Sequence, residues 1–206
     1  MNRLRHWGIA FGLTIVAVVG CYFWLDRPLA YLAHDHLTQF KLFSRLTLIT
    51  EPFTATAAIV LIILGIKSLS KRRLSHPEAI ALLWSISIFV TAVLKNQFKF
   101  VFGRTWPETW TNNNPSLIRD GVHNFNPFHG GSGFESFPSG HMAAMCVTAT
   151  ILWLCYPRFK VAYALCTAVV AIGLIGANYH FLSDIIAGGF LGASVGFIAV
   201  VRHSAT

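Results

Sequence analysis

Long continuous apolar runs, rather than alternating apolar and polar positions, dominate this chain. A helix needs about 20 apolar residues to cross the hydrocarbon core of a membrane. Six windows approach or reach that length: residues 7–25, 47–69, 79–101, 141–156, 161–177 and 184–201. The last three are short or contain polar residues, but they are rich in Gly and Ala, as closely packed membrane helices are. The pattern predicts an all-α, polytopic membrane protein with a six-transmembrane-helix bundle.

Composition supports this class and excludes others. Hydrophobic residues make up 54% of the 206-residue chain and charged residues only 12%, whereas soluble domains carry about 25% charged residues. The net charge of +8 does not indicate nucleic-acid binding, because the densest basic run, residues 67–73, directly follows an apolar window. The cysteines lie inside apolar runs without metal-ligand spacing, so they are typical of small buried hydrophobes.

The distribution of Lys and Arg predicts the orientation, because cytoplasmic segments carry an excess of both. Placing the N-terminus inside assigns most basic residues to the cytoplasm and nearly all acidic residues to the outside. Both termini are then cytoplasmic, and the loops 26–46 and 104–138 face outward. The first window has the outline of a secretory signal, but its apolar run is long for one, so we expect it to stay as an uncleaved helix.

The two outer loops have different compositions. Residues 26–46 mix charges with Leu, Phe and Tyr, which favours an amphipathic helix lying on the membrane. Residues 104–138, called the outer loop below, are far longer than a simple connection requires and combine Gly- and Asn-rich turns with many aromatic residues. That combination predicts an ordered lid at the level of the lipid headgroups.

Three groups of polar residues are predicted at the outer ends of the helices, where ionisable side chains are costly and indicate function. In the first group, Lys95 and Lys99 share a helical face and Arg104 follows one turn later. Cations at a helix C-terminus are ordinary in themselves, because they complement the helix dipole. Together, however, Lys and Arg also suit a phosphate dianion.

The second and third groups carry histidines. Ser139 is a natural N-cap before an apolar helix, Gly140 allows close backbone approach, and His141 follows at a helix start whose free N–H groups can bind an anion. His180 and Asp184 are four residues apart and would share one face of a helix. A carboxylate on one ring nitrogen leaves the other available as a nucleophile. Each group alone also fits an ordinary structural role.

Together the three groups supply the parts for phosphoryl transfer through a phosphohistidine. We predict that His180 attacks phosphorus, that Asp184 orients it and stabilises the imidazolium, and that His141 protonates the leaving oxygen. No metal or other cofactor is expected, because protein cations cover the developing charge. The predicted phosphate-binding residues are Lys99, Arg104, Ser139 and Gly140.

These motifs resemble those of the type 2 phosphatidic acid phosphatase superfamily, which contains membrane lipid-phosphate phosphatases. The resemblance spans about residues 95–190: the family's PSGH motif is complete at residues 138–141, and His180 and Asp184 match its S-R-x5-H-x3-D motif. It implies that residues 1–206 form one integral membrane hydrolase domain that acts on phosphoric monoesters or diphosphates without a metal. We predict a location in a bacterial inner (plasma) membrane, and the orientation from Lys and Arg places the active site on the outer, periplasmic face.

Two family positions hold other residues. With the family's K-x6-R-P motif aligned on Lys99 and Pro107, Trp106 stands in place of its Arg. Leu174 stands in place of the Arg of the third motif. Arg104 is the expected substitute for the first. The residues that could compensate for the second are Lys95, Arg119 and Asn178.

The predicted substrate is an amphiphile with a phosphate or diphosphate headgroup. Lipid A, undecaprenyl diphosphate, phosphatidylglycerol phosphate and phosphatidic acid all fit the resemblance. Alternatives are a phosphotransferase between lipids, a catalytically impaired lipid-binding protein and an anion transporter. A metal site outside the membrane is a weaker alternative, because histidines are common in loops that face water; its ligands would be His34, Asp35, His36, His123 and His129.

Overall fold

The computed structural model describes residues 2–110 and 112–203, with side chains from Arg5 onward, and in these residues every regular element is helical. The longer elements are α1 (Asn2–Gly20), α2 (Asp26–His36), α4 (Pro52–Leu69), α5 (His76–Phe102), α7 (Gly140–Cys155), α8 (Lys160–Gly176) and α9 (Leu182–His203). Two short helices, α3 (Lys41–Thr47) and α6 (Leu117–Asp120), lie in the connections. The all-α class predicted from the apolar runs is confirmed.

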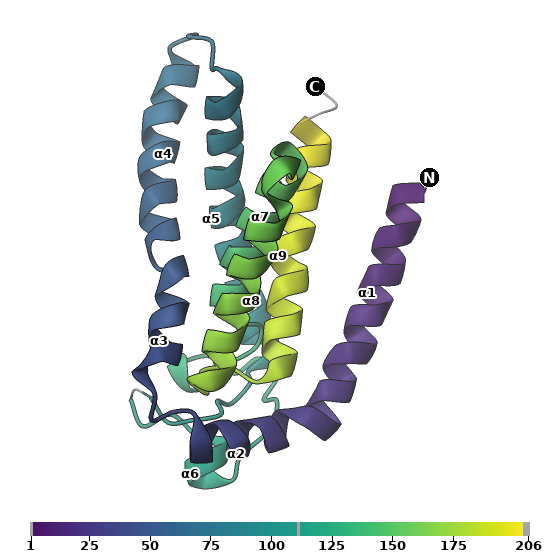
Figure 1. Ribbon diagram of the computed structural model, residues 1–206, viewed down its shortest axis with the longest axis vertical. Helices are drawn as coiled ribbons and strands as arrows, with labels where there is room; N and C mark the ends of the chain where they lie inside the picture. The colour runs from purple at the N-terminus through teal and green to yellow at the C-terminus, as the bar shows by residue number, and fades with distance from the viewer. Residues whose placement is uncertain (1, 111, 204–206) are drawn as a thin grey trace.

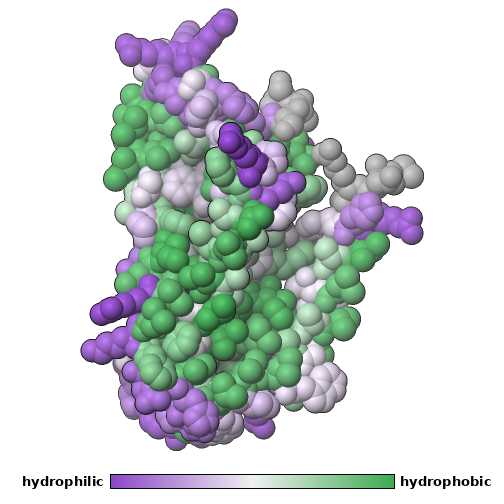
Figure 2. Space-filling view, viewed as in Figure 1, coloured by the Kyte–Doolittle hydropathy of each residue, from purple (hydrophilic) through white to green (hydrophobic). Residues whose placement is uncertain are grey.

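Helices α4, α5, α7, α8 and α9 run along the long axis of the molecule, and α1 stands at one side (Figure 1). Among the described residues, five helical segments are long and apolar enough to cross a membrane, namely Arg5–His36, Lys41–Leu69, His76–Phe102, Pro157–Gly176 and Leu182–His203. The remaining predicted span, α7, is apolar but has only 16 residues. On the face drawn in Figure 2, hydrophobic residues form a band between hydrophilic ends. Within residues 2–110 and 112–203, the bundle therefore contains five long apolar helices and one shorter one.

The first predicted window does not end in a loop. A π-helical turn at Cys21–Leu25 leads from α1 directly into α2, and α2 crosses the lower end of the bundle (Figure 1). This is the direction expected of an amphipathic helix in a membrane surface. Aromatic side chains join α1 to the bundle, because Trp7 and Phe11 both contact Phe190 of α9.

Helices α7 and α9 are held in backbone contact by three glycines of α9, Gly188, Gly192 and Gly196, one helical turn apart. A β-carbon on Gly188 would lie 2.3 Å from the carbonyl oxygen of Ser139, and one on Gly192 would lie 2.1 Å from that of Ala143. Small residues at this spacing are typical of close helix pairs in membranes. The packing sets the beginning of α9 beside the beginning of α7.

Helix α5 ends where the outer loop begins, at Gly103. This glycine has a φ of 55°, and a β-carbon there would lie 1.9 Å from the carbonyl oxygen of Asn126. Only glycine fits such a left-handed, crowded position. The loop is held by backbone bonds, because Asn126 donates to the Gly103 carbonyl at 2.8 Å and Ser136 to the Arg104 carbonyl at 3.2 Å. The described parts of the loop, residues 104–110 and 112–138, are fixed by such contacts; residue 111 lies outside the described residues, and the lid role stays a prediction.

The glycine contacts yield a stability prediction. We expect Gly192→Ala to lower the midpoint of thermal unfolding in detergent, because the new methyl group overlaps the Ala143 carbonyl of α7; overpacking of this kind typically costs about 1–3 kcal/mol. The matched control is Gly65→Ala in α4, where nothing lies within 4 Å of the added carbon. Equal midpoints for the two variants would contradict the packing described.

Candidate active site

A cavity of about 410 Å³ opens at the loop end of the bundle. Its wall is built from α5, the start of α4, the outer loop, the start of α7 and the turn between α8 and α9. The basic and aromatic side chains that line it include Lys95, Lys99, Trp106, Trp110, His141 and His180. Segments far apart in the sequence therefore meet in one polar site.

The two predicted catalytic histidines face each other in this cavity. His141 lies in the first turn of α7, and His180 lies in the turn before α9. Their ring centroids are 6.2 Å apart with planes at 65°, and the His180 ring also lies 5.2 Å from the ring of Trp106. The two imidazoles can therefore contact the same phosphoryl group.

Asp184 lies behind His180 and is fully buried. One carboxylate oxygen is 3.6 Å from Nδ1 of His180, slightly beyond hydrogen-bond length, and accepts hydrogen bonds from the Ser136 hydroxyl at 2.7 Å and the Phe181 N–H at 3.0 Å. His180 precedes the first residue of α9, so the shared helical face predicted for this pair is wrong. Instead Asp184 lies in the first turn of α9 and reaches back to the residue before the helix, as in half of a capping box.

Burial lowers the pKa of His180 below the ordinary value of 6.5, and the nearby Asp184 carboxylate opposes this effect without cancelling it. A histidine whose pKa is lowered stays neutral at neutral pH. The neutral ring is the form that can attack an electrophile.

Two lysines supply positive charge to the cavity. Lys95 packs directly over Gly140, where a β-carbon would lie 2.9 Å from its Cδ. The Nζ of Lys99 lies 3.7 Å from Glu135 and 5.7 Å from the centroid of the Trp106 ring. Both lysines line the cavity beside the first residues of α7. Basic side chains beside a helix start are an arrangement that suits an anion.

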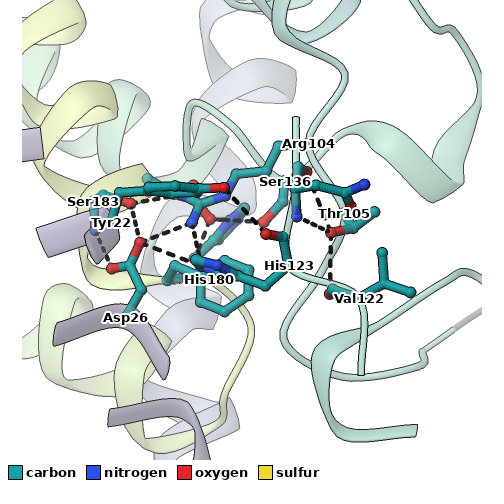
Figure 3. Close-up of polar contacts among 12 residues, drawn as sticks. Tyr22, Asp26, Arg104, Thr105, Val122, His123, Ser136, His180 and Ser183 are labelled. Atoms are coloured by element: carbon teal, nitrogen blue, oxygen red, sulfur yellow. Dashed lines mark hydrogen bonds and ion pairs between the residues drawn. The ribbon is translucent and has the colours of Figure 1, made fainter. Parts of the chain in front are cut away.

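Arg104, which was predicted to bind the phosphate, does not line the cavity. Its side chain is fully buried, and both terminal nitrogens are engaged by protein groups (Figure 3). Nη1 donates to Asp184 and to Ser183, both at 2.5 Å. Nη2 donates to Asp26 at 2.7 Å and to Nε2 of His123 at 2.9 Å. Because these partners hold its guanidinium behind the cavity wall, Arg104 supports Asp184 and does not point toward a bound phosphate.

Aromatic rings enclose this guanidinium. Its central carbon lies 4.3 Å from the ring centroid of Phe181, 4.9 Å from that of Phe125 and 5.2 Å from that of Tyr22. Rings at these distances attract a cation and exclude water. The turn at Gly103 and this aromatic enclosure together direct Arg104 inward.

Comparison with known proteins assigns the family. The model of the PAP2 superfamily matches residues 78–205, which is more than half of the chain. The chain belongs to the PAP2 superfamily. The matched residues include α5, the outer loop and the helices that carry His141, His180 and Asp184.

Among curated relatives, the chain is similar to the lipid A 1-phosphatases of Rhizobium johnstonii, 33% identical over 134 residues, and Rhizobium etli, 32% identical over 129 residues. The aligned parts cover 63% and 60% of this chain but only 52% of each relative, so the chain spans about half the length of these proteins. It also resembles the crystal structure of a transmembrane PAP2 type phosphatidylglycerolphosphate phosphatase from Bacillus subtilis, with a TM-score of 0.56 and 18% identity over 97% of this chain and 96% of that one. That likeness shows the PAP2 transmembrane fold and an integral membrane protein with multiple transmembrane helices.

Within this PAP2 fold, the two family arginine positions have separate environments. Trp106 lines the cavity beside His180. Leu174 is completely buried in a cluster with Met142 and Ile185, so its side chain has no access to the cavity. No arginine is among the described residues that line the cavity.

Only one of the three residues proposed to compensate reaches the cavity, and it is Lys95. Arg119 is exposed and pairs with Asp120 at 2.8 Å and with the side chain of Asn113. Asn178 is buried and donates to the Ala30 carbonyl at 3.0 Å and to Glu108 at 3.1 Å. Lys95 is therefore the candidate for the missing cation.

Ser139 caps α7 as predicted, because its hydroxyl accepts from the N–H of Met142 at 3.4 Å. It is fully buried, and its own N–H donates to the Asp184 carbonyl at 3.0 Å. Gly140 lines the cavity, whereas Ser139 does not. Ser139 therefore joins α7 to α9.

Four residues of the site were not identified from the sequence. Asp26, His123, Ser136 and Ser183 are buried around Arg104 and Asp184. One feature of the sequence indicated Asp26: it is an acidic residue directly after a long apolar run, and an acid at membrane depth is costly.

The residues of the alternative metal site do not come together. His123 contacts Arg104, and His34 pairs with Glu108 at 2.6 Å. Among the described residues no group of three or more His, Cys, Asp and Glu could hold a metal ion.

The lowered pKa of His180 can be measured directly. We expect its ring to titrate below pH 6.5, because burial disfavours the charged form. NMR of histidine-labelled protein in detergent micelles would follow the ring, with His180→Ala identifying the signal by its loss. Any rate that requires neutral His180 should then fall only as the pH drops through this lowered pKa. A midpoint above 6.5 would contradict the burial argument.

Proposed function

We propose that this protein hydrolyses the phosphate or diphosphate headgroup of a membrane lipid through a phosphohistidine on His180. The observation that carries the proposal is the meeting of His141 and His180 across one cavity, with ring centroids 6.2 Å apart. Membership of the PAP2 superfamily supports the same reaction. The relatives named as lipid A 1-phosphatases support the class of substrate.

In the first step a neutral ring nitrogen of His180 attacks phosphorus, and the bond from phosphorus to the lipid oxygen breaks. His141, as imidazolium, donates its proton to that oxygen, so the lipid leaves as an alcohol, or as a phosphate when the substrate is a diphosphate. The phosphorylated His180 ring is positively charged, and the carboxylate of Asp184 at 3.6 Å stabilises this charge.

In the second step His141, now neutral, removes a proton from water, and the oxygen attacks phosphorus. The bond between phosphorus and nitrogen breaks, which releases inorganic phosphate and restores neutral His180. Lys95, Lys99 and the N–H of Gly140 hold the other phosphoryl oxygens in both steps. With lysines in place of an arginine fork, the phosphate is held by point charges rather than by paired hydrogen bonds.

A lipid with a phosphorylated sugar headgroup, such as lipid A, is the first substrate to test. Trp106, Trp110 and Tyr179 give the cavity aromatic walls, while Glu51 and Thr54 add polar groups that can bond to hydroxyls. Flat aromatic faces with polar groups nearby suit a sugar ring. Undecaprenyl diphosphate, phosphatidylglycerol phosphate and phosphatidic acid are the comparison substrates.

The proposed orientation has the cavity on the outer, periplasmic face of a bacterial inner membrane. The start of α1 and the end of α9 lie toward the end of the bundle opposite the outer loop (Figure 1), and the excess of Lys and Arg supports a cytoplasmic location for that end. The substrate would then enter from the outer leaflet.

A phosphotransferase that passes phosphate from His180 to a lipid hydroxyl would use the same first step. The vacant arginine positions at Trp106 and Leu174 favour a second alternative, a lipid-binding protein with impaired catalysis. Analysis of the products distinguishes the three functions. A hydrolase releases inorganic phosphate, a phosphotransferase moves the phosphate to another lipid, and a lipid-binding protein leaves it on the substrate.

Phosphate release from the four lipids by purified protein tests the proposal. We expect His180→Ala to abolish release and Lys99→Ala to lower kcat/KM by about 10- to 100-fold, the usual effect of one charge-assisted hydrogen bond. The control is Lys160→Ala, which removes an exposed lysine at the start of α8. Activity should survive a chelator.

Three results would overturn this proposal: release that persists in His180→Ala, complete loss of release with a chelator, or no release from any of the lipids. Equal losses in Lys99→Ala and Lys160→Ala would mean that lysine charge acts at long range and that Lys99 does not bind the phosphate.

A further inference from the structure

Two carboxylates share one guanidinium behind the catalytic histidine. Asp26, Arg104 and Asp184, called the buried charge cluster below, all have completely buried side chains. Arg104 lies 2.7 Å from Asp26 through Nη2 (Figure 3) and 2.5 Å from Asp184 through Nη1. The cluster contains two acids and one base, so it carries one net negative charge when all three are ionised.

Asp26 comes from a part of the chain that the family match does not include. It is the first residue of α2, whereas the PAP2 match begins at residue 78. Oδ1 of Asp26 accepts a hydrogen bond from the N–H of Ser183 at 3.0 Å. Oδ2 of Asp26, which also accepts from Arg104, accepts from the Ser183 hydroxyl. The N-terminal segment thus reaches the residue next to Asp184.

The neighbours of the cluster preserve its charge. A guanidinium only donates hydrogen bonds, so Nε2 of His123 accepts from Arg104; the same nitrogen lies 3.9 Å from Asp26. Phe125, Phe181 and Tyr22 enclose Arg104. In such a dry environment the charges act on a neighbouring ring with little screening.

The charge balance matters because the proposed reaction makes His180 positive. If Arg104 were paired with Asp184 alone, the two charges would cancel beside the ring. From this arrangement we infer that Asp26 is a positioning residue: it holds Arg104 from the side of α2 and leaves the buried charge cluster with one net negative charge, which stabilises the imidazolium of His180.

Other charged groups face His180 from the cavity. Lys95 and Lys99 of α5 and His141 of α7 line it, and so does Glu51, directly before α4. Positive charge on the lysines and on His141 disfavours an imidazolium at His180, whereas the Asp184 carboxylate, 3.6 Å from its Nδ1, favours one. The use of Asp26 in catalysis rests on the proposed function, whereas its effect on the charge of His180 does not.

Asp26→Asn tests the inference, because it removes one negative charge from the cluster and keeps a side chain of the same shape. We expect the NMR titration midpoint of His180 to move to lower pH. With a lipid phosphate as substrate, we expect kcat to fall at least tenfold while KM stays within about twofold, because Asp26 does not line the cavity.

The control His34→Ala breaks the other polar link between α2 and the outer loop, the contact of His34 with Glu108 at 2.6 Å. It should leave both the His180 midpoint and kcat unchanged. If His34→Ala reproduced the effects of Asp26→Asn, the role of Asp26 would be to anchor α2 and the inference would be wrong.

The double variant Asp26→Asn with Arg104→Gln restores the net charge, because only Asp184 then remains ionised in the cluster. We expect its His180 midpoint to return toward the wild-type value. This variant also carries the test if Asp26→Asn alone does not fold. A midpoint that stays low in the double variant, or one that never moves in Asp26→Asn, would overturn the inference.

These readouts separate two kinds of failure. If the protein releases no phosphate from any lipid, the proposed function fails, yet the His180 midpoint still reports the charge of the cluster. If wild-type protein is active and the midpoint does not respond to Asp26, only the present inference fails.

Discussion

The burial of one carboxylate, that of Asp184, is the constraint on which the rest of the site depends. An ion moved out of water costs several kcal/mol unless other groups replace its hydration. Here the Ser136 hydroxyl, the Phe181 N–H and the Arg104 guanidinium replace it. Arg104 is itself buried and needs further acceptors, which Asp26 and His123 supply. Satisfying one buried charge therefore joins α2, the outer loop and α9, and this places a carboxylate behind His180.

The helix packing determines which groups the buried carboxylate faces. Glycines in α9 allow its backbone to contact α7, so that the N–H of Ser139 reaches the carbonyl of Asp184. The start of α7, with its free N–H groups and His141, then faces His180 across the cavity. Close helix packing, which membrane proteins achieve with small residues, thus sets the distance between the two rings. The short length of α7 leaves this polar helix start at the loop end of the bundle, where an amphiphile can reach it.

Local patterns in the sequence were enough to predict the helices, the meeting of His141 with His180 and the nearness of Asp184. They were not enough to place Arg104. Its direction depends on the left-handed turn at Gly103 and on Asp26, which precedes it by 78 positions in a different helix. The His180–Asp184 pair was predicted from helical spacing, yet it forms because Asp184 reaches back across the start of α9. Sequence spacing predicts which residues come close when the contact is local, whereas side-chain direction depends on packing between distant segments.

Trapping of the phosphorylated protein tests the central claim most directly. Wild-type protein mixed with lipid labelled in its phosphate group and quenched within milliseconds should carry label that is stable in alkali, lost in acid and located on the peptide that contains His180. His141→Ala protein should gain and lose this label more slowly, because His141 both protonates the leaving oxygen and removes a proton from the attacking water. Release of phosphate without any such label, or label located on another residue, would contradict the account.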